Sequence, residues 1–161
     1  MSKSTVDLKS KSIANNQKSF IKLLVFTIGK LTLALPILQV QKVVKHDRVH
    51  GSGLSHVNLA HLADREIAVV DLHQKLFKVG LLETTQTKGY FIITKNITGD
   101  SLGILVSESP ALINVDITHI RLIPDSYRRA DTLEIASHVA VIPQEDESNQ
   151  TIFILDIEKL V

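Results

Sequence analysis

Short runs of leucine, valine and isoleucine recur along the chain, and each run ends at a glycine, a proline or a polar cluster. Such runs predict β-strands, and the tight turns between them predict antiparallel pairing. From residue 20 the sequence reads FIKLLVFTIG, turns at Gly29-Lys30 and continues as LTLAL with alternate leucines on one face. This predicts a hairpin. After Pro36, the stretch ILQVQKVVKH predicts a bend and a third strand.

The same order of elements returns in the second half of the chain. Between residues 90 and 115 the sequence reads YFIIT, a glycine turn, SLGILV, a proline bend and ALINV. The residues differ from those of 23–44, so the repeat lies in the pattern alone. Repeated patterns tend to fold as repeated structures. We therefore expect two similar, intertwined β-subdomains, at about residues 20–88 and 89–161.

The remaining segments add one short helix and further strands. Residues Leu72–Phe77 (LHQKLF) place apolar side chains on one helical face and predict a short helix that plugs the end of a sheet. A polar turn joins EIASHVAVI (134–142) to TIFILDI (151–157), which predicts a final strand pair. Because no long amphipathic helix is present, the expected fold class is all-β, built of barrels or sandwiches.

Composition narrows the classes of protein that this chain can represent. Of its 161 residues, 44% are hydrophobic and 22% charged, the balance of a globular protein with a sizeable core. Uncharged apolar stretches such as Leu31–Gln41 and Ser109–Val115 are far shorter than a membrane span. The polar start lacks the apolar segment of a signal peptide, and there is no cysteine for a disulfide or a thiolate site. We expect a cytoplasmic protein that does not insert into the membrane.

The charge pattern argues against nucleic acid as a partner. The net charge is +1, although residues 1–19 carry four lysines and one aspartate. We predict that this stretch is a flexible basic tail kept in solvent, with contact to an acidic partner as the alternative. Tyr127-Arg128-Arg129 sets one aromatic ring beside two cations, which is too little for a basic patch.

The sequence contains no recognisable catalytic or cofactor motif. The glycines Gly51 and Gly53 precede no helical pattern and match neither a phosphate-binding loop nor a dinucleotide-binding turn. Several histidines and aspartates crowd the first half, but His56 and His61, five residues apart, share neither a strand face nor a helix face. No catalytic residue, metal site or cofactor is predicted, and a histidine-based metal enzyme is a distant alternative. Its candidate groups are His46, His50, His56, His61, His73, Asp64 and Asp71.

Five segments in order resemble the CheW family of chemotaxis coupling proteins. They are LLVFTIG (Leu23–Gly29), ILQVQKVV (Ile37–Val44), REIAVVDL (Arg65–Leu72), LGILVSESPALINV (Leu102–Val115) and ILDIEKLV (Ile154–Val161). The resemblance covers nearly the whole chain from residue 23. Two regions depart from the family pattern. Where the family has Asn-Leu-Arg-Gly, this chain has His61-Leu-Ala-Asp64, and the family's Glu in its Val-Gln-Glu-Ile stretch is Lys42.

The resemblance implies two SH3-like, five-stranded β-barrel subdomains around a shared core, with short helices at the connections and the C-terminus. It also implies a protein without catalytic activity that bridges receptors to a CheA-type histidine kinase, in chemotaxis, phototaxis or pilus motility. The implied partners are the kinase's regulatory domain, which has the same fold, and the cytoplasmic tip of methyl-accepting chemoreceptors. The implied location is the inner face of the membrane, within receptor arrays.

The resemblance also suggests which residues contact partners. Val40, Lys42 and Val43 match the Val-Gln-Glu-Ile stretch. The divergent segment His61–Asp64 adds Leu62, Ala63 and Asp64 as candidates. The second-half segment Leu102–Val115 adds Leu105 and Ser107. Valine and leucine are buried by default, so the alternative for the apolar members is an ordinary place in the core. Loss of the family's Arg at Ala63 leaves a second possibility open, a regulator or competitor that binds the kinase without coupling it to receptors.

Overall fold

The structure is a computed structural model that describes residues 19–46, 56–62, 65–78, 89–124 and 134–160. Most of these residues form strands. The strands are β2 Phe20–Ile28, β3 Leu31–Pro36, β4 Val40–His46, β5 Val57–Leu62, β6 Arg65–Val70, β7 Gly89–Lys95, β8 Ser101–Val106, β9 Ala111–Asp116, β10 Ile120–Leu122, β11 Ala136–Pro143 and β12 Asn149–Leu155. The helical segments are η1 Ile37–Gln39, α1 Leu72–Phe77, η2 Ile117–His119 and η4 Ile157–Lys159.

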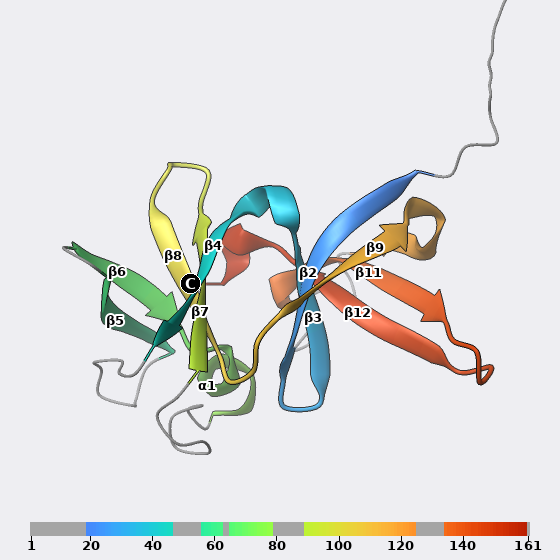
Figure 1. The fold of residues 1–161 in the computed structure, drawn as a ribbon, viewed down its shortest axis with the longest axis horizontal. Coiled ribbons are helices and arrows are strands. Elements are labelled where there is room, and N and C mark those ends of the chain that lie inside the picture. The colour runs from blue at the N-terminus through green and yellow to red at the C-terminus, as the bar shows by residue number, and fades with distance from the viewer. Residues whose placement is uncertain (1–18, 47–55, 63–64, 79–88, 125–133, 161) are drawn as a thin grey trace, which may run out of the picture.

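The strands form two sheets that lie side by side (Figure 1). One sheet has six strands in the order β10-β11-β12-β3-β2-β9, and the other has five in the order β4-β7-β8-β6-β5. The prediction of an all-β fold is confirmed. The expected pair of five-stranded barrels is corrected in detail, because no ladder between described residues joins the end strands of either sheet.

The repeated strand order is real, and the third strand of each repeat changes sheets. β2 and β3 form a hairpin in the six-stranded sheet, and β4 then pairs with β7 in the other sheet. β7 and β8 form the equivalent hairpin, and β9 crosses back to pair with β2. A division at residue 88 therefore separates the two repeats but not the two sheets, each of which contains strands from both halves (Figure 1).

The ladders show which positions of the two halves correspond. In the six-stranded sheet β3 lies parallel to β12, with Ala34 opposite Ile154. In the five-stranded sheet β8 lies parallel to β6, with Gly103 opposite Val69. All other ladders of the described strands are antiparallel, so the two parallel pairs identify equivalent positions in the two halves of the chain.

Two aspartates occupy equivalent positions in the two halves. Asp71 and Asp156 each follow the central parallel strand by one residue. The N–H of Asp71 donates to the carbonyl of His56 at 2.7 Å, and the N–H of Asp156 donates to that of Ile135 at 2.8 Å. The carboxylate of each then accepts a backbone N–H from the short helix that follows, an N-cap that satisfies a donor left free at a helix start.

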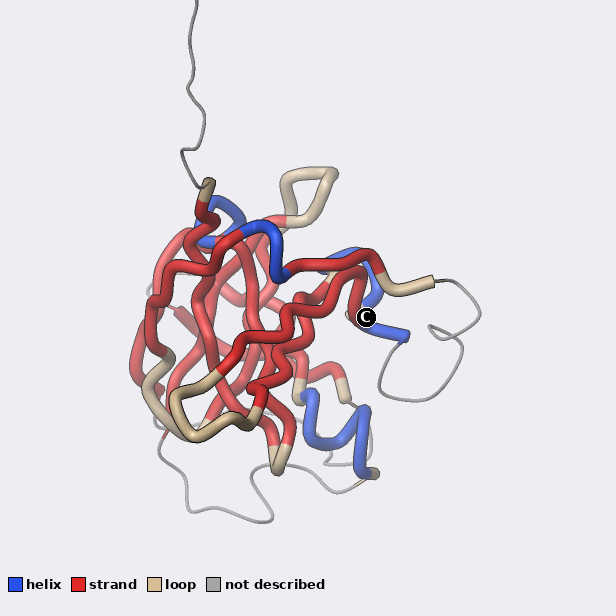
Figure 2. The backbone as a smooth tube through the Cα atoms, turned by 90° about the vertical axis from the view of Figure 1, so that its right-hand side faces the viewer, coloured by secondary structure: helices blue, strands red, loops and turns tan. Residues whose placement is uncertain are grey.

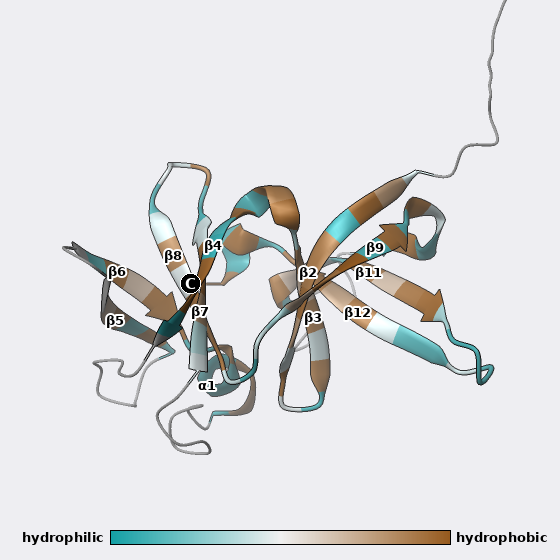
Figure 3. Cartoon of the chain, in the orientation of Figure 1, coloured by the Kyte–Doolittle hydropathy of each residue, from teal (hydrophilic) through white to brown (hydrophobic). Residues whose placement is uncertain are grey.

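Alternating side chains divide between a central core and two outer cores. On β2, Leu24, Phe26 and Ile28 enter the central core between the sheets, whereas Leu23 enters the outer core of the six-stranded sheet. Phe91 on β7 enters the outer core of the five-stranded sheet. Because both faces of the central strands are buried, these strands read as nearly continuous apolar runs. The hydropathy colouring shows this, with hydrophobic strands near the crossing of the sheets and a hydrophilic β11–β12 turn (Figure 3).

The predicted local features are largely present. The turn at Gly29-Lys30 joins β2 to β3, with Gly29 at a φ of +60°. The helix spans Leu72–Phe77, as its apolar spacing indicates. The stretch from Ile37, expected as a bend and a third strand, forms a turn of 3-10 helix followed by β4 from Val40. The helical segments are short and lie at the ends of strands (Figure 2).

Several predicted features lie outside the described residues. They are the basic tail up to residue 18, Tyr127-Arg128-Arg129, and two of the partner-binding candidates, Ala63 and Asp64.

Candidate partner-binding site

Three of the predicted partner-binding residues lie on β4, an edge strand. Among the described strands β4 pairs with β7 alone. The ladder shifts register between Val40 and Lys42, so Gln41 is the extra residue of a β-bulge. A bulge turns the following side chains to the other face, and this places Val40 and Lys42 on opposite faces of the sheet. The edge thus presents side chains in two directions.

The burial of the side chains on β4 follows these faces. Val40 is half-buried and packs against the central core, and Val44 packs against the outer core. Val43, opposite Ile92, faces the central side but remains 37% exposed at the edge. Lys42 and Lys45 are exposed. The exposed side chains of β4 therefore include one apolar group, Val43, with a cation on either side of it along the strand.

Neither β4 nor its described neighbour β7 supplies an acid that could neutralise these two cations. β4 reads VQKVVKH and its neighbour β7 reads GYFIITK, so neither strand contains a carboxylate. Neither Lys42 nor Lys45 has an ion-pair partner among the residues that the structure describes. Sequence analysis singled out Lys42 but passed over Lys45, which nothing distinguishes until the ladder places it at the open edge.

The tip of the β5–β6 hairpin holds the second predicted group. Leu62 pairs with Arg65 at the last step of the ladder, immediately before Ala63 and Asp64. The side chain of Leu62 and all of Ala63 and Asp64 lie outside the described part of the chain. β5 is the end strand opposite to β4 in the ladder order, so the first two groups lie at different edges of one sheet.

The third predicted group lies on and just after β8, and its two residues differ in burial. Leu105 is fully buried in the outer core of the five-stranded sheet, so its side chain offers no surface to a partner. This favours the alternative of an ordinary core residue. Ser107 is half-buried and follows Val106, which pairs with Tyr90 on β7, as Lys45 does from the other side. Ser107 thus lies at the same end of the sheet as Lys45, two strands away.

Other apolar side chains are exposed that the sequence did not single out. Leu38 in η1 and Ile97 in the β7–β8 turn are almost fully exposed. Leu112 on β9 is 53% exposed. It pairs with Leu24 on β2 as Val43 pairs with Ile92 on β7, so Leu112 and Val43 occupy equivalent edge positions. In the sequence, the apolar segments that contain Leu112 and Val43 look like those of any other strand. Only the strand pairing shows that these two residues lie at an exposed edge.

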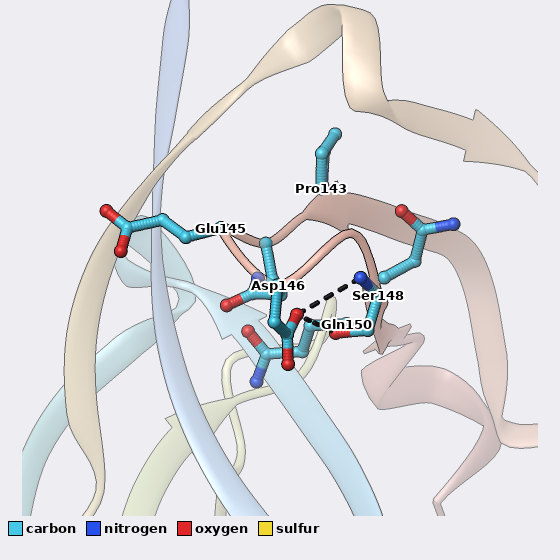
Figure 4. A pocket seen from close by; sticks show the side chains of 7 residues that line it. Pro143, Glu145, Asp146, Ser148 and Gln150 are labelled. Carbon is cyan, nitrogen blue, oxygen red and sulfur yellow. Dashed lines mark hydrogen bonds between the residues drawn. The ribbon is translucent and has the colours of Figure 1, made fainter.

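The β11–β12 turn surrounds an open hollow of about 700 Å³ lined by seven residues (Figure 4). A carboxylate oxygen of Asp146 accepts the backbone N–H and the hydroxyl of Ser148, and these hydrogen bonds lower the pKa of Asp146. The Glu145 side chain points away from the turn (Figure 4). The acidic groups here are exposed, and Asp146 bonds within the turn itself, so the geometry is that of a polar surface turn.

A second hollow, of about 440 Å³, lies where η1, the β7–β8 turn and η4 meet. The N–H of Ile97 donates to a carboxylate oxygen of Glu158 at 2.9 Å. Asn96 organises the turn, because its side-chain oxygen accepts the N–H groups of Thr98 and Asp100. The bonds described here join parts of the same molecule and serve its folding.

The histidines do not converge on a metal site within the described ranges, where no three ligand-type side chains form a group. His73 packs its ring against Phe77, with centroids 4.9 Å apart. His56 has a buried Nε2 without a hydrogen-bond partner. Burial lowers the pKa of His56, and the charges of Lys75 and Lys78 lower it further, while Asp71 acts in the opposite direction. No described helix is long and apolar enough to cross a membrane.

Comparison with known proteins assigns the fold described above. A family model of the CheW-like domain matches residues 22–161. The chain belongs to the CheW-like family. Among solved structures, the scaffolding protein TtCheW from Thermoanaerobacter tengcongensis is similar, with a TM-score of 0.68, 19% sequence identity and coverage of 91% of each chain. None of the curated proteins compared with the chain matches it.

Membership of the CheW-like family carries a general functional statement. The family consists of scaffold and adaptor proteins of chemotaxis signalling and is generally non-catalytic. The resemblance found in the sequence is therefore confirmed. The fold is that of the family's scaffold proteins, and β4 forms one edge of the described five-stranded sheet, where Val43 is exposed.

Proposed function

We propose that this protein couples chemoreceptor-type receptors to a CheA-type histidine kinase without catalysing a reaction itself. The family match over residues 22–161 carries the proposal. The motility system served by the receptors is chemotaxis, phototaxis or pilus motility. The contact surface includes Lys42 and Val43 on β4, with Ser107 at the same end of the sheet and the β5–β6 tip at the opposite edge.

Two features of the described surface support this proposal. An adaptor needs a rigid body with separate surfaces for separate partners, and the central core fixes the two sheets to each other. Each sheet ends in a strand with an open edge and an exposed apolar side chain, Val43 on β4 and Leu112 on β9. Open edges and exposed apolar groups are common means of protein contact.

A second candidate function is a regulator that binds the kinase but not receptors. The observation in its favour is the sequence of the β5–β6 tip, where Ala63 and Asp64 stand in place of the family's Arg and Gly. A methyl group cannot replace the hydrogen bonds and charge of a guanidinium. This difference affects the partner that contacts the tip and leaves β4 unchanged.

Binding of the full-length kinase from the same organism, measured by calorimetry with and without a receptor signalling fragment, tests the proposal. We expect saturable binding to both, and a change in kinase autophosphorylation only when receptor is present. Kinase binding without any receptor effect would establish the regulator instead. Binding to neither partner would overturn both functions.

A matched pair of variants assigns the surface. Val43 and Val141 are similarly exposed, at 37% and 36%, but lie on different sheets. We expect Val43→Glu to weaken partner binding by at least about tenfold, because it places a new charge within the contact. Val141→Glu serves as the control and should bind normally. Equal effects of the two substitutions would exclude β4 as the contact.

A further inference from the structure

The open edge of β4 has a charge pattern specific enough to describe its partner. Lys42 is opposite Ile93 and Lys45 is opposite Tyr90, so the two cations stand on opposite faces of one strand. Val43 shares the face of Lys45 and is exposed between them. The neighbouring strand β7 places only uncharged side chains, Ile93 and Tyr90, opposite the two lysines. Among the described residues, neither β4 nor β7 supplies an acidic side chain that complements these charges.

The equivalent edge in the other sheet differs in charge. β9 reads ALINVD, and Leu112 takes the position of Val43. No lysine or arginine is present on β9. β9 instead ends in an acidic residue, Asp116, and further acidic groups of the six-stranded sheet lie in the β11–β12 turn, at Glu145, Asp146 and Glu147. The cationic character thus belongs to the β4 edge and is not a general property of the two edges.

We propose that the open edge of β4 pairs with an acidic edge strand of the kinase's regulatory domain. Two carboxylates three residues apart on that strand face Lys42 and Lys45, and an apolar side chain between them faces Val43. This inference rests on the proposed function and names the chemistry of one partner. Strand pairing satisfies the free N–H and C=O groups of β4, and opposite charges directly across two strands stabilise the pair.

The backbone geometry decides between the two expected partners. A receptor tip, if helical, satisfies its own backbone hydrogen bonds and cannot extend a ladder. A regulatory domain of the same fold contains edge strands of its own, as β4 and β9 are here. The spacing of three residues follows from the ladder, because Lys42 and Lys45 are separated by three steps and lie on opposite faces.

Charge reversal tests the inference with full-length chains. The probe is the full-length kinase of the same organism, titrated calorimetrically at about 50 and about 300 mM salt. The double variant Lys42→Glu/Lys45→Glu should bind at least about tenfold more weakly than the wild type and lose most of the salt dependence. Both side chains are exposed, so the fold should survive, and thermal unfolding verifies this. Lys22→Glu, at an exposed position of β2 in the other sheet, is the control and should bind as the wild type does.

The outcomes separate this inference from the proposed function. If the wild type binds kinase and the double variant binds equally well, the acidic partner strand is excluded while the adaptor function stands. If the double variant loses receptor binding alone, or loses self-association alone, the edge serves another partner and the inference fails. If the wild type binds no kinase, both the inference and the proposed coupling function are wrong. Restored binding by a kinase variant with the matching carboxylates changed to lysine would support it most directly.

Discussion

The two equivalent hairpins, β2–β3 and β7–β8, contact the opposite sheet through different kinds of interaction. The β2–β3 turn lies against α1, where a Cβ added at Gly29 would be 3.0 Å from the ring of Phe77. The β7–β8 turn lies against η4, where the N–H of Ile97 donates to Glu158. The first contact is apolar and close, and the second is a charge-assisted hydrogen bond at the surface.

The difference shows that a repeated topology does not require a repeated contact. Each turn has only to hold its hairpin against the helix that ends the central strand of the other sheet. The close apolar contact leaves little room for a side chain at Gly29, whereas the polar contact leaves Ile97 exposed and leaves open space around Gly99. We therefore expect the first contact to tolerate substitution less well than the second.

The largest expected effect tests whether the two outer cores are equivalent. Leu23 and Leu105 are both fully buried, one in each outer core. Leu→Ala at either position should lower the free energy of unfolding by about 2–5 kcal/mol, because it removes buried methyl groups and leaves a cavity. Chemical denaturation measures the loss. A Leu105→Ala protein of normal stability with weakened partner binding would return Leu105 to the partner surface.

A smaller effect compares the two glycine turns. Gly29 and Gly99 both have positive φ, at +60° and +88°. Gly99→Ala should cost about 1 kcal/mol from backbone strain, and Gly29→Ala about 2 kcal/mol because Phe77 must also move. Thermal unfolding of both variants measures the difference. In a Phe77→Ala background the extra cost at Gly29 should vanish, and its persistence would show that the contact with α1 does not cause it.

The smallest effect concerns pH. The carbonyls of His56 and Ile135 accept equivalent hydrogen bonds, but only the first half has an ionisable side chain there. The pKa of His56 is lowered from 6.5 by burial and by two lysines, so below about pH 6.5 the unfolded chain binds more protons than the folded one. Stability should therefore fall as the pH drops from about 7 to about 5, by less than about 1 kcal/mol from this group.

Replacing His56 by the residue of the other half isolates this contribution. His56→Ile should flatten the decline of the melting temperature between about pH 7 and pH 5, and the wild type measured alongside gives the reference slope. An unchanged slope in His56→Ile would assign the acid sensitivity to other groups.

The local parts of the fold could be predicted from the sequence because their causes are local. The helix at Leu72–Phe77 follows from apolar spacing and the capping Asp71, and the turn at Gly29-Lys30 follows from a glycine between two apolar runs. The bulge at Gln41 could not be predicted, because it depends on the register against β7. Leu105 and Val43 were assigned to the same surface because both lie in family-like segments, and only burial separates them.

The sequence by itself determined where the strands lie, that both faces of the central strands are apolar, and that the same order occurs twice. Only the tertiary structure decided which sheet each strand joins. β4 and β9 exchange sheets, and this sets which side chains stand at an open edge. The physical reason is that a period of two specifies two faces of a strand, whereas its neighbours depend on residues distant in the chain. The cationic edge of β4 exists through that pairing.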